Sequence, residues 1–323
     1  MRESGVRSVD VSRCVIVTGR KSTARLSAGT PEGVLFLTAG YGTRADPLSV
    51  LRPKALLPWG EETLLGRLIA QASILGAGIF CANASRCPEL VLAELPAAGP
   101  DGAESRLLFE ERPLGTASTI CRMGRAGVGG TWVVSNTDMI METPFESMLA
   151  SHLDSGAHWT VMTGDMPETG DYGELPVDDD GAFGIRKGYG RHYLGISILE
   201  PEVFELAVMT LGRGSLFGDL APAARSKGLI LRSFEYRGEW KDMGRLESIR
   251  RNILGRGCFV HPFASVSSGA ELQGSFYVGR NCIVAEGASV RDSVMLDSSV
   301  VTTGQLIDSV LPWYCRFPEV LCD

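Results

Sequence analysis

The feature that most constrains the fold is a six-residue repeat near the end of the chain. Aliphatic residues recur at this interval seven times in succession, at Val260, Val266, Leu272, Val278, Val284, Val290 and Leu296. The residues four positions after these are mostly small, at Ala264, Ala270, Phe276, Cys282, Ala288, Val294 and Val300. This spacing is typical of a left-handed parallel β-helix, with aliphatic side chains turned inward and small residues at tight corners. Residues 260–311 therefore predict roughly three coils, within a domain of residues 257–323.

The preceding chain alternates between apolar strands and amphipathic helices. Strands are predicted at residues 34–37, 79–81, 107–109, 131–134 and 159–163, and helices after Thr63 and from Pro88, Pro144 and Pro201. This alternation predicts an α/β fold, a doubly wound mixed sheet over residues 31–256 in which most strands are parallel. Residues 1–30 carry five arginines, one lysine and two acids, and we expect them to form a disordered extension.

Composition excludes several classes of protein. An apolar content of 44% with a charged content of 21% is typical of a soluble globular protein. No apolar run reaches the roughly 20 residues of a transmembrane helix, so no membrane partner is expected. The net charge of −7 gives no electrostatic footprint for nucleic acid. The eight cysteines form no Cys-x-x-Cys pair, and this scatter indicates reduced thiols in the cytoplasm.

The first predicted strand of the sheet ends in small residues and two closely spaced glycines. Gly40-x-Gly42 lets the backbone pass close to a bulky anion and direct N–H groups at it. Thr43 adds a hydroxyl, and two fixed positive charges suit phosphate oxygens. For Gly-x-Gly alone, the alternative is an ordinary turn between a strand and a helix. The segment predicts a nucleoside triphosphate cradle made of Thr38, Ala39, Gly40, Gly42, Thr43, Arg44 and Lys54.

The longer pattern Gly-x-Gly-Thr-Arg-x-x-Pro-Leu-Ser-x-x-x-Pro-Lys-Ala-Leu-Leu-Pro is more specific. It closely resembles the signature loop of the sugar-1-phosphate nucleotidyltransferases, or NDP-sugar pyrophosphorylases. A Rossmann fingerprint would need a third glycine where Ala45 stands, and no Walker A Gly-Lys-Ser/Thr is present. The resemblance implies the family's Rossmann-like nucleotidyltransferase fold and transfer of a nucleotidyl group to a sugar 1-phosphate, with Arg44 and Lys54 as catalytic residues.

Three further motifs extend the resemblance to nucleotide and metal. Pro-Leu-Gly-Thr-Ala after the strand at 107–109 is similar to the family's base-pocket element, which implies nucleotide contacts at Glu111, Gly115 and Thr116. An ordinary loop with a helix cap is the alternative there. Asn136-x-Asp138 and Trp240-x-Asp242-x-Gly resemble the two metal-binding aspartates of the family. Because Mg²⁺ binds hard oxygens and bridges to substrate phosphates, the resemblance implies Mg²⁺ at Asp138 and Asp242, although such aspartates otherwise often cap helices.

The sugar pocket matches the family less well. Tyr172-Gly173 and the strand around Gly195 resemble segments beside the sugar. The family's Glu-Lys-Pro is replaced by Gly-Ile-Arg-Lys-Gly, in which Lys187 or Arg186 could supply the cation but the carboxylate is missing. The resemblance implies sugar contacts at Tyr172, Gly173, Lys187 and Gly195, with the sugar's identity left open. The run of three aspartates and a glycine at 178–181 predicts a hairpin turn rather than a metal site.

The base-pocket motif looks more like the mannose-1-phosphate guanylyltransferase branch, which favours GTP with mannose or heptose 1-phosphate. A uridylyltransferase acting on an N-acetylated sugar 1-phosphate is an alternative. A non-catalytic regulatory paralogue that binds a sugar nucleotide is another, favoured by the missing Glu-Lys-Pro. An acyltransferase β-helix would need a catalytic histidine, and only His261 lies near. We therefore expect the β-helix to serve assembly or regulation, with a homo-oligomer formed through or beside it.

Overall fold

The computed structural model describes residues 15–18, 29–167, 172–184, 188–210 and 214–318. The chain divides into two compact units. One unit, here called the sheet unit, comprises Met1–Gly40 and Leu65–Trp240. The other, here called the coil unit, comprises Tyr41–Leu64 and Lys241–Asp323. The signature segment from Tyr41 onward therefore falls in the same unit as the C-terminal repeats.

The sheet unit is built on a mixed sheet with the strand order β1-β6-β5-β2-β7-β11-β9-β12, and β10 pairs with β11. Neighbours among β6, β5, β2 and β7 are parallel, while β11 runs antiparallel to both β7 and β9. The strands are β1 Val15–Thr18, β2 Gly33–Leu37, β5 Ile79–Ala84, β6 Glu104–Phe109, β7 Trp132–Asn136, β9 Trp159–Gly164, β10 Glu174–Val177, β11 Tyr189–Leu199 and β12 Leu231–Glu235. Short strands β8 (Met139–Met141) and β13 (Trp240–Asp242) lie outside this sheet.

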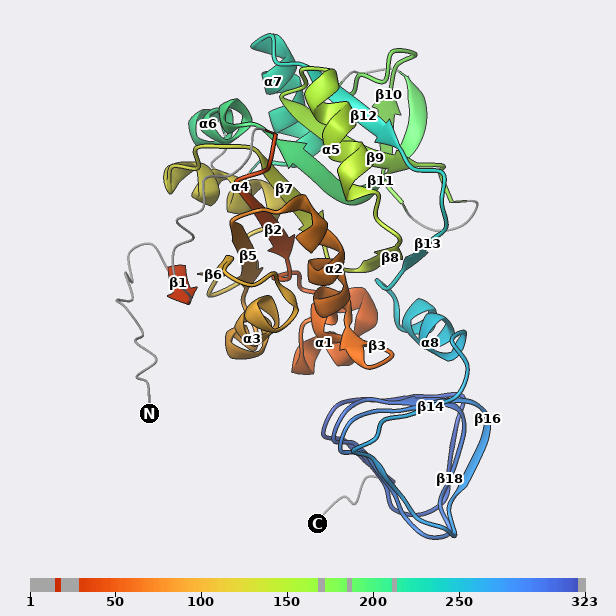
Figure 1. The fold of residues 1–323 in the computed structure, drawn as a ribbon. Helices are drawn as coiled ribbons and strands as arrows, with labels where there is room; N and C mark the ends of the chain where they lie inside the picture. Colours follow the sequence, from red (N-terminus) through yellow and green to blue (C-terminus); the bar gives the residue numbers. More distant parts are fainter. Residues whose placement is uncertain (1–14, 19–28, 168–171, 185–187, 211–213, 319–323) are drawn as a thin grey trace, which may run out of the picture. The chain divides into compact units, whose positions relative to one another are not determined.

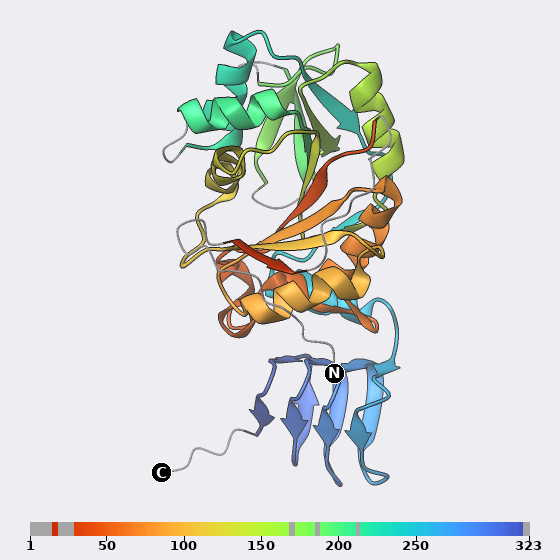
Figure 2. The same ribbon diagram turned by 60° about the vertical axis from the view of Figure 1, so that its left-hand side comes forward.

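Helices lie on both sides of the sheet, which is the doubly wound arrangement expected from the alternating sequence (Figure 2). They are α2 Leu64–Ala72, α3 Pro88–Ala98, α4 Thr116–Arg125, α5 Phe145–Asp154, α6 Pro201–Thr210 and α7 Ala221–Ser226, with a 3-10 turn η3 Ser73–Leu75 and a π-helical turn η4 Leu216–Leu220. Large side chains fill the space between sheet and helices, among them the fully buried Trp132, Trp159 and Phe204. Their removal from water is the main stabilising contribution to this unit.

The predicted strands and helices of this region are present. Within the segment expected to be a disordered extension, β1 pairs antiparallel with β6; residues 1–14 and 19–28 lie outside the described residues. The aspartate run forms the expected turn, because Asp178 Oδ1 accepts hydrogen bonds from the N–H groups of Asp180 and Ala182. Gly181, with φ 76°, closes that turn.

The coil unit contains parallel strands that stack coil upon coil. Figure 1 shows these coils, in blue, as a stack of three-sided turns. The strands are β14 Phe259–Val260, β15 Ser265–Val266, β16 Glu271–Val278, β17 Ile283–Val284, β18 Ser289–Met295, β19 Val300–Val301, β20 Gln305–Ile307, β21 Val310–Leu311 and β22 Arg316–Phe317. Every ladder among them is parallel. Their inward core is Val278, Cys282, Val284, Ala288, Val290, Met295, Val301, Leu306 and Leu311.

The six-residue spacing does not extend as far as predicted. Met295 pairs with Val278 and takes the place in the coil core that the period predicted for Leu296, although Leu296 is itself fully buried. The cause is a register shift between β16 and β18, where one residue, Asp292, takes the place of two, Gly274 and Ser275. Asp292 has φ 47°, a left-handed conformation that tightens the corner.

The coil unit also holds the signature segment from Tyr41 onward and helix α8. These elements are the 3-10 turns η1 Thr43–Ala45 and η2 Lys54–Leu56, the helices α1 Leu48–Leu51 and α8 Leu246–Leu254, and the hairpin of β3 Pro58–Trp59 and β4 Glu62–Thr63. Helix α8 packs against β16 and β18.

Cys81, Cys121, Cys258 and Cys282 carry free thiols.

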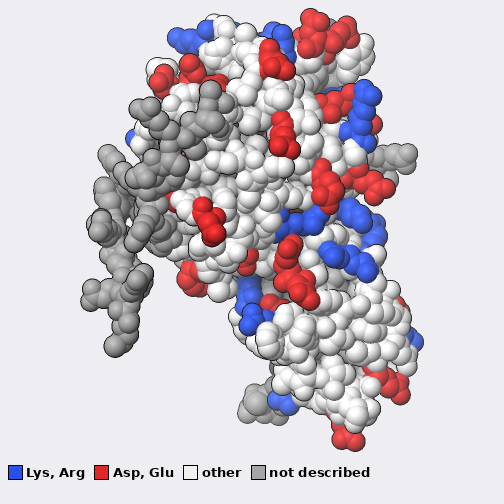
Figure 3. Space-filling model, in the orientation of Figure 1, with Lys and Arg blue, Asp and Glu red and all other residues white. Residues whose placement is uncertain are grey.

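Basic and acidic side chains both occur on the face drawn in Figure 3. None of the helices that the structure describes combines the length and the apolar character of a membrane span.

Candidate active site

The carboxyl ends of β2, β5, β6 and β7 lie side by side because these strands pair in parallel. Leu37 on β2 is opposite Asn83 on β5 and Asn136 on β7. The hydroxyl of Thr137 donates a 3.0 Å hydrogen bond to the carbonyl of Leu37, which ties the two strand ends together. The structure thus brings the start of the signature loop, at Thr38, to the same edge as the half-buried Asp138. Ligands of open α/β sheets bind at such edges.

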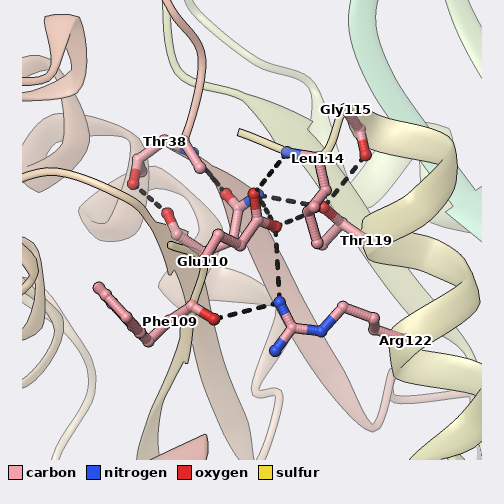
Figure 4. Close-up of polar contacts among 9 residues, drawn as sticks. Thr38, Phe109, Glu110, Leu114, Gly115, Thr119 and Arg122 are labelled. Atoms are coloured by element: carbon pink, nitrogen blue, oxygen red, sulfur yellow. Dashed lines mark hydrogen bonds and ion pairs between the residues drawn. The ribbon is translucent and has the colours of Figure 1, made fainter. Parts of the chain in front are cut away.

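A buried carboxylate joins this edge to the predicted base-pocket loop (Figure 4). Glu110, 2% exposed, follows β6 directly and accepts hydrogen bonds from the backbone N–H of Leu114 (3.0 Å), the hydroxyl of Thr119 (2.8 Å) and the side-chain amide of Asn83 (3.0 Å). Asn83 Oδ1 in turn accepts the N–H groups of Thr38 (2.8 Å) and Ala39 (3.3 Å). One hydrogen-bonded network therefore fixes both loops that sequence analysis associates with the nucleotide.

The charge of Glu110 is balanced by Arg122 on α4. Arg122 Nη1 lies 4.0 Å from Glu110 Oε1 and donates a 3.1 Å hydrogen bond to the carbonyl of Phe109. A buried carboxylate is tolerated only with such partners, since an unpaired charge would strongly destabilise the fold. The network is therefore a rigid support beneath the loop at 111–115 rather than part of the exposed surface.

Two predicted nucleotide contacts, Gly115 and Thr116, lie where the loop held by Glu110 meets helix α4. Gly115 has φ 84°, and a Cβ built on it would meet no atom within 4 Å, so open space surrounds it. Thr116 begins α4. Glu111 is exposed, whereas its neighbour Glu110 makes the buried contacts.

Three residues of this network, Asn83, Glu110 and Thr119, were not predicted from the sequence. A signal for Asn83 was available: it is the one polar residue in β5, whose six residues are all buried. Buried amides in strands need hydrogen-bond partners, so this residue could have indicated a network. The partners themselves come from other elements and carry no local signal.

The predicted sugar contacts lie partly near the same edge. Gly195 on β11 has φ 81°, and a Cβ there would stand 2.8 Å from the Cβ of Asn136, so only glycine fits beside the predicted metal motif. Tyr172 packs edge-on against His192 at 4.8 Å and against Trp240 at 6.2 Å between ring centroids. Gly173 is exposed, and Lys187 lies outside the described residues.

In the coil unit, the signature loop turns sharply at Gly42. Its φ is 65°, and a Cβ would lie 2.8 Å from the Cβ of Ser49, so two independent constraints require glycine here. The Ser49 hydroxyl donates to the Gly42 carbonyl at 2.9 Å and also to the Asp46 carboxylate. This arrangement leaves Thr43 and Arg44 exposed on a short 3-10 turn, and Lys54 half-buried at the start of the next one.

Arg44 and Asp242 come together around a second glycine. Asp242 Oδ1 accepts a 2.8 Å hydrogen bond from the N–H of Gly244. A Cβ on Gly244 would lie 2.7 Å from Asp242 Oδ1 and 3.2 Å from Arg44 Nη2. The glycine of the Trp-x-Asp-x-Gly motif therefore allows the predicted catalytic cation and one predicted metal ligand to approach each other.

The two predicted metal ligands lie in different units, Asp138 in the sheet unit and Asp242 in the coil unit. Within the described ranges, no group of three or more His, Cys, Asp or Glu side chains could hold a metal ion. This does not count against the prediction, because Mg²⁺ is commonly held by one or two carboxylates together with water and substrate phosphates. Carboxylate oxygens are the right chemical type of donor.

These features define the class of protein: an α/β protein with a glycine-dependent loop after its first parallel strand and polar side chains at the carboxyl ends of parallel strands. Comparison with known sequences identifies the family. Residues 33–254 match the nucleotidyl transferase family, and the chain belongs to that family. It is therefore an enzyme that transfers nucleotidyl groups.

Similar proteins are mannose-1-phosphate guanylyltransferases. A probable mannose-1-phosphate guanylyltransferase 1 of Oryza sativa subsp. japonica is 25% identical, over 83% of this chain and 85% of that protein. The enzyme of Mycobacterium tuberculosis is 26% identical, over 85% and 82%. Among solved structures, HddC of Yersinia pseudotuberculosis has a TM-score of 0.55 at 21% identity, covering 68% of this chain and 97% of that one. A UDP-glucose pyrophosphorylase has a TM-score of 0.57 at 16% identity, covering 70% and 98%. These structural likenesses establish the fold.

Proposed function

We propose that the protein joins an NTP and a sugar 1-phosphate into an NDP-sugar and pyrophosphate, with GTP and mannose or heptose 1-phosphate as substrates. The observation that carries the proposal is the signature loop. Gly42 adopts a conformation that only glycine fits, and the turn after it leaves Thr43 and Arg44 exposed. The guanylyltransferase relatives support the choice of base and sugar.

In this reaction an oxygen of the sugar 1-phosphate attacks the α-phosphorus of the NTP in line. A phosphorus–oxygen bond forms to the attacking oxygen, and the bond to the oxygen bridging the α- and β-phosphates breaks as pyrophosphate leaves. Both reactants are anions, so positioning and charge neutralisation are the main requirements. Arg44 would bind the transferring phosphoryl group and the departing pyrophosphate, and Lys54 would hold phosphate oxygens. No general base is needed, since a phosphate monoester is largely ionised at neutral pH.

We assign Mg²⁺ binding to Asp138 and Asp242. When bound, the ion would neutralise phosphate charge. The 2.8 Å hydrogen bond from Gly244 to Asp242 orients that carboxylate, and the tie between Thr137 and Leu37 fixes the backbone just before Asp138. On the nucleotide side, Thr38, Ala39, Gly40, Glu111, Gly115 and Thr116 would contact the NTP; on the sugar side, Tyr172, Gly173, Lys187 and Gly195 would contact the sugar phosphate.

Pyrophosphate release by the purified protein tests the proposal. The four NTPs are each combined with mannose, heptose, glucose and N-acetylglucosamine 1-phosphates in the presence of Mg²⁺. Release with GTP and mannose or heptose 1-phosphate supports it, whereas release with UTP and the N-acetylated sugar favours the uridylyltransferase. No release in any combination, together with tight binding of a sugar nucleotide by calorimetry, would favour the regulatory paralogue suggested by the missing Glu-Lys-Pro.

We further propose that the stacked coils form a left-handed parallel β-helix that follows a nucleotidyltransferase domain of residues 31–256. The three-sided turns and inward aliphatic side chains support this assignment. An experimental map would give the handedness directly. We also propose a homo-oligomer formed through or beside the coils, because among the described strands β14 and β15 at one end of the stack, and β20, β21 and β22 at the other, each pair on one side only. Light scattering coupled to size-exclusion chromatography would measure its mass.

A further inference from the structure

The coils hold the signature segment at two points, and the first is Arg52. This residue precedes Lys54 by two positions and is not part of the triphosphate cradle itself. Its guanidinium carbon lies 4.8 Å from the ring centroid of Tyr314 and 5.6 Å from that of Trp313. Arg52 Nη2 donates a hydrogen bond to the Tyr314 hydroxyl, and Nη1 lies 3.8 Å from the Asp297 carboxylate.

Arg52 and Trp313 are buried in this contact, whereas Tyr314 covers the guanidinium from the exposed side and is itself 62% exposed. The Arg52 side chain is only 15% exposed and Trp313 is 1% exposed. A guanidinium stacked on aromatic rings and paired with a carboxylate is held in a defined orientation, unlike a solvated surface arginine. Tyr314 adopts φ 61°, so the chain turns sharply where its ring is presented to Arg52.

The second point of attachment is the hairpin that follows the loop. The Tyr277 hydroxyl donates a 3.1 Å hydrogen bond to the carbonyl of Gly60. Arg256, between α8 and the first coil, lies 4.6 Å above the ring of Trp59. Lys54 is thus in a stretch of chain attached to the coils on both sides, at Arg52 and at Gly60.

We propose that Arg52 is a positioning residue, through which the C-terminal coils fix the triphosphate loop and thereby set the affinity for the NTP. The coils are then a structural component of the nucleotide site and not only a module for assembly. This inference rests on the proposed function, because it takes the segment containing Lys54 as the phosphate-binding loop. A loop released at Arg52 would sample more conformations, and the NTP would have to order it on binding.

The test compares Arg52→Met with Arg280→Met. Arg280 is a matched control, because it also stacks on an aromatic ring of the coils, Phe263 at 5.1 Å, without reaching the signature segment. We expect Arg52→Met to raise both the Kd and the KM for the NTP by about tenfold, with the KM for the sugar 1-phosphate changing by less than about twofold. Arg280→Met should leave all three constants unchanged. Arg52→Lys, which keeps the charge but not the planar stacking, should fall in between.

The NTP Kd is measured by calorimetry without the sugar phosphate, so it does not depend on turnover. Equal NTP affinity in Arg52→Met, Arg280→Met and wild type would overturn the inference, as would equal increases in the KM of both substrates. If Arg52→Met fails to fold, Tyr314→Phe takes its place, because this change removes only the hydroxyl. An unchanged NTP Kd in both Tyr314→Phe and Arg52→Lys, each shown to be folded, would then overturn the inference. Wild type that binds NTP but releases no pyrophosphate contradicts the proposed function and leaves this comparison intact. Wild type that binds no NTP contradicts both.

Discussion

Asp138 stands at the end of β7, where the sequence turns from buried strand to polar loop. We predict that Asp138→Asn lowers Mg²⁺-dependent pyrophosphate release by roughly 100-fold or more, because the amide keeps the shape but loses the charge that holds the cation. The melting temperature should stay close to that of wild type, since the side chain is only half-buried. Turnover is measured over a Mg²⁺ titration, and Asp101→Asn, in an exposed turn, is the control. Normal turnover in Asp138→Asn would remove Asp138 from the metal site.

Gly42 carries a constraint of a different kind, in the backbone. We predict that Gly42→Ala destabilises the fold by more than about 1 kcal/mol, because the new Cβ meets Ser49 at 2.8 Å and the left-handed φ of 65° is unfavourable for alanine. Urea unfolding gives the free energy of unfolding. Gly129→Ala is the matched control, since a Cβ there would meet nothing within 4 Å and its φ is not left-handed. Equal stability of the two variants would contradict the strain argument.

Among the elements, α4, β6, β5 and β2 meet at the buried Glu110. We predict that Thr119→Val destabilises the protein by roughly 1–3 kcal/mol, because it removes the hydroxyl that donates to Glu110 at 2.8 Å and accepts from Asn83 at 3.2 Å. The KM for the NTP should also rise, because the loop at 114–115 loses part of its support. Thr119→Ser retains the hydroxyl and should restore both quantities towards wild type. Denaturant unfolding measures the free energy of unfolding, and steady-state kinetics measure the KM for the NTP. If Thr119→Ser is as unstable as Thr119→Val and has the same KM, the methyl group and not the hydrogen bond is responsible.

A second, partly buried hydrogen-bond network joins α5 to the sheet, and we expect its contribution to stability to depend on pH. His152 Nε2 lies 2.9 Å from Glu200 Oε1, Thr131 donates to the same oxygen at 2.7 Å, and His152 Nδ1 is 2.7 Å from the Thr160 hydroxyl. Burial opposes ionisation of Glu200, but the hydrogen bonds from His152 and Thr131 outweigh it and lower the pKa of the carboxyl below its usual 4.5. The folded state therefore favours the ionised carboxylate.

A lowered folded-state pKa stabilises the protein above the unfolded-state pKa, and this contribution is lost as the pH falls through the folded-state value. We predict that Glu200→Gln lowers the free energy of unfolding at pH 7 by roughly 1–2 kcal/mol, and that the difference from wild type shrinks below about pH 4.5. Urea unfolding from pH 7 to pH 3.5 measures it. A difference that stays constant over this range would refute the linkage.

At the scale of the whole molecule, the sequence predicted those features whose signals lie within a few neighbouring residues. Apolar runs and caps predicted β2, β5, β6, β7 and β9 with their intervening helices, because burial and helix termination act within a few residues. The signature motif predicted a family that the comparisons confirm. The stack of coils followed from the period of six, since an inward side chain recurs once on each side of a three-sided coil.

The remainder depends on contacts between distant parts of the chain. Met295 and Leu296 are both apolar, so the composition of the repeat could not reveal the one-residue register shift at Asp292. Glu110 lies beside the predicted Glu111, and only the hydrogen bonds to Asn83 and Thr119 distinguish them. Likewise, no local pattern indicates that Tyr41–Leu64 groups with Lys241–Asp323. Long-range pairing of this kind is a property of the folded chain.

The most direct test of nucleotidyl transfer follows the oxygen atoms. Sugar 1-phosphate labelled with ¹⁸O at its three non-bridging positions is incubated with NTP, Mg²⁺ and the wild-type protein, and both products are analysed by mass spectrometry. Attack of the sugar phosphate on the α-phosphorus predicts an NDP-sugar that retains all three labels and pyrophosphate that carries none. Loss of one label from the NDP-sugar, or no NDP-sugar with any NTP and sugar 1-phosphate, would contradict it.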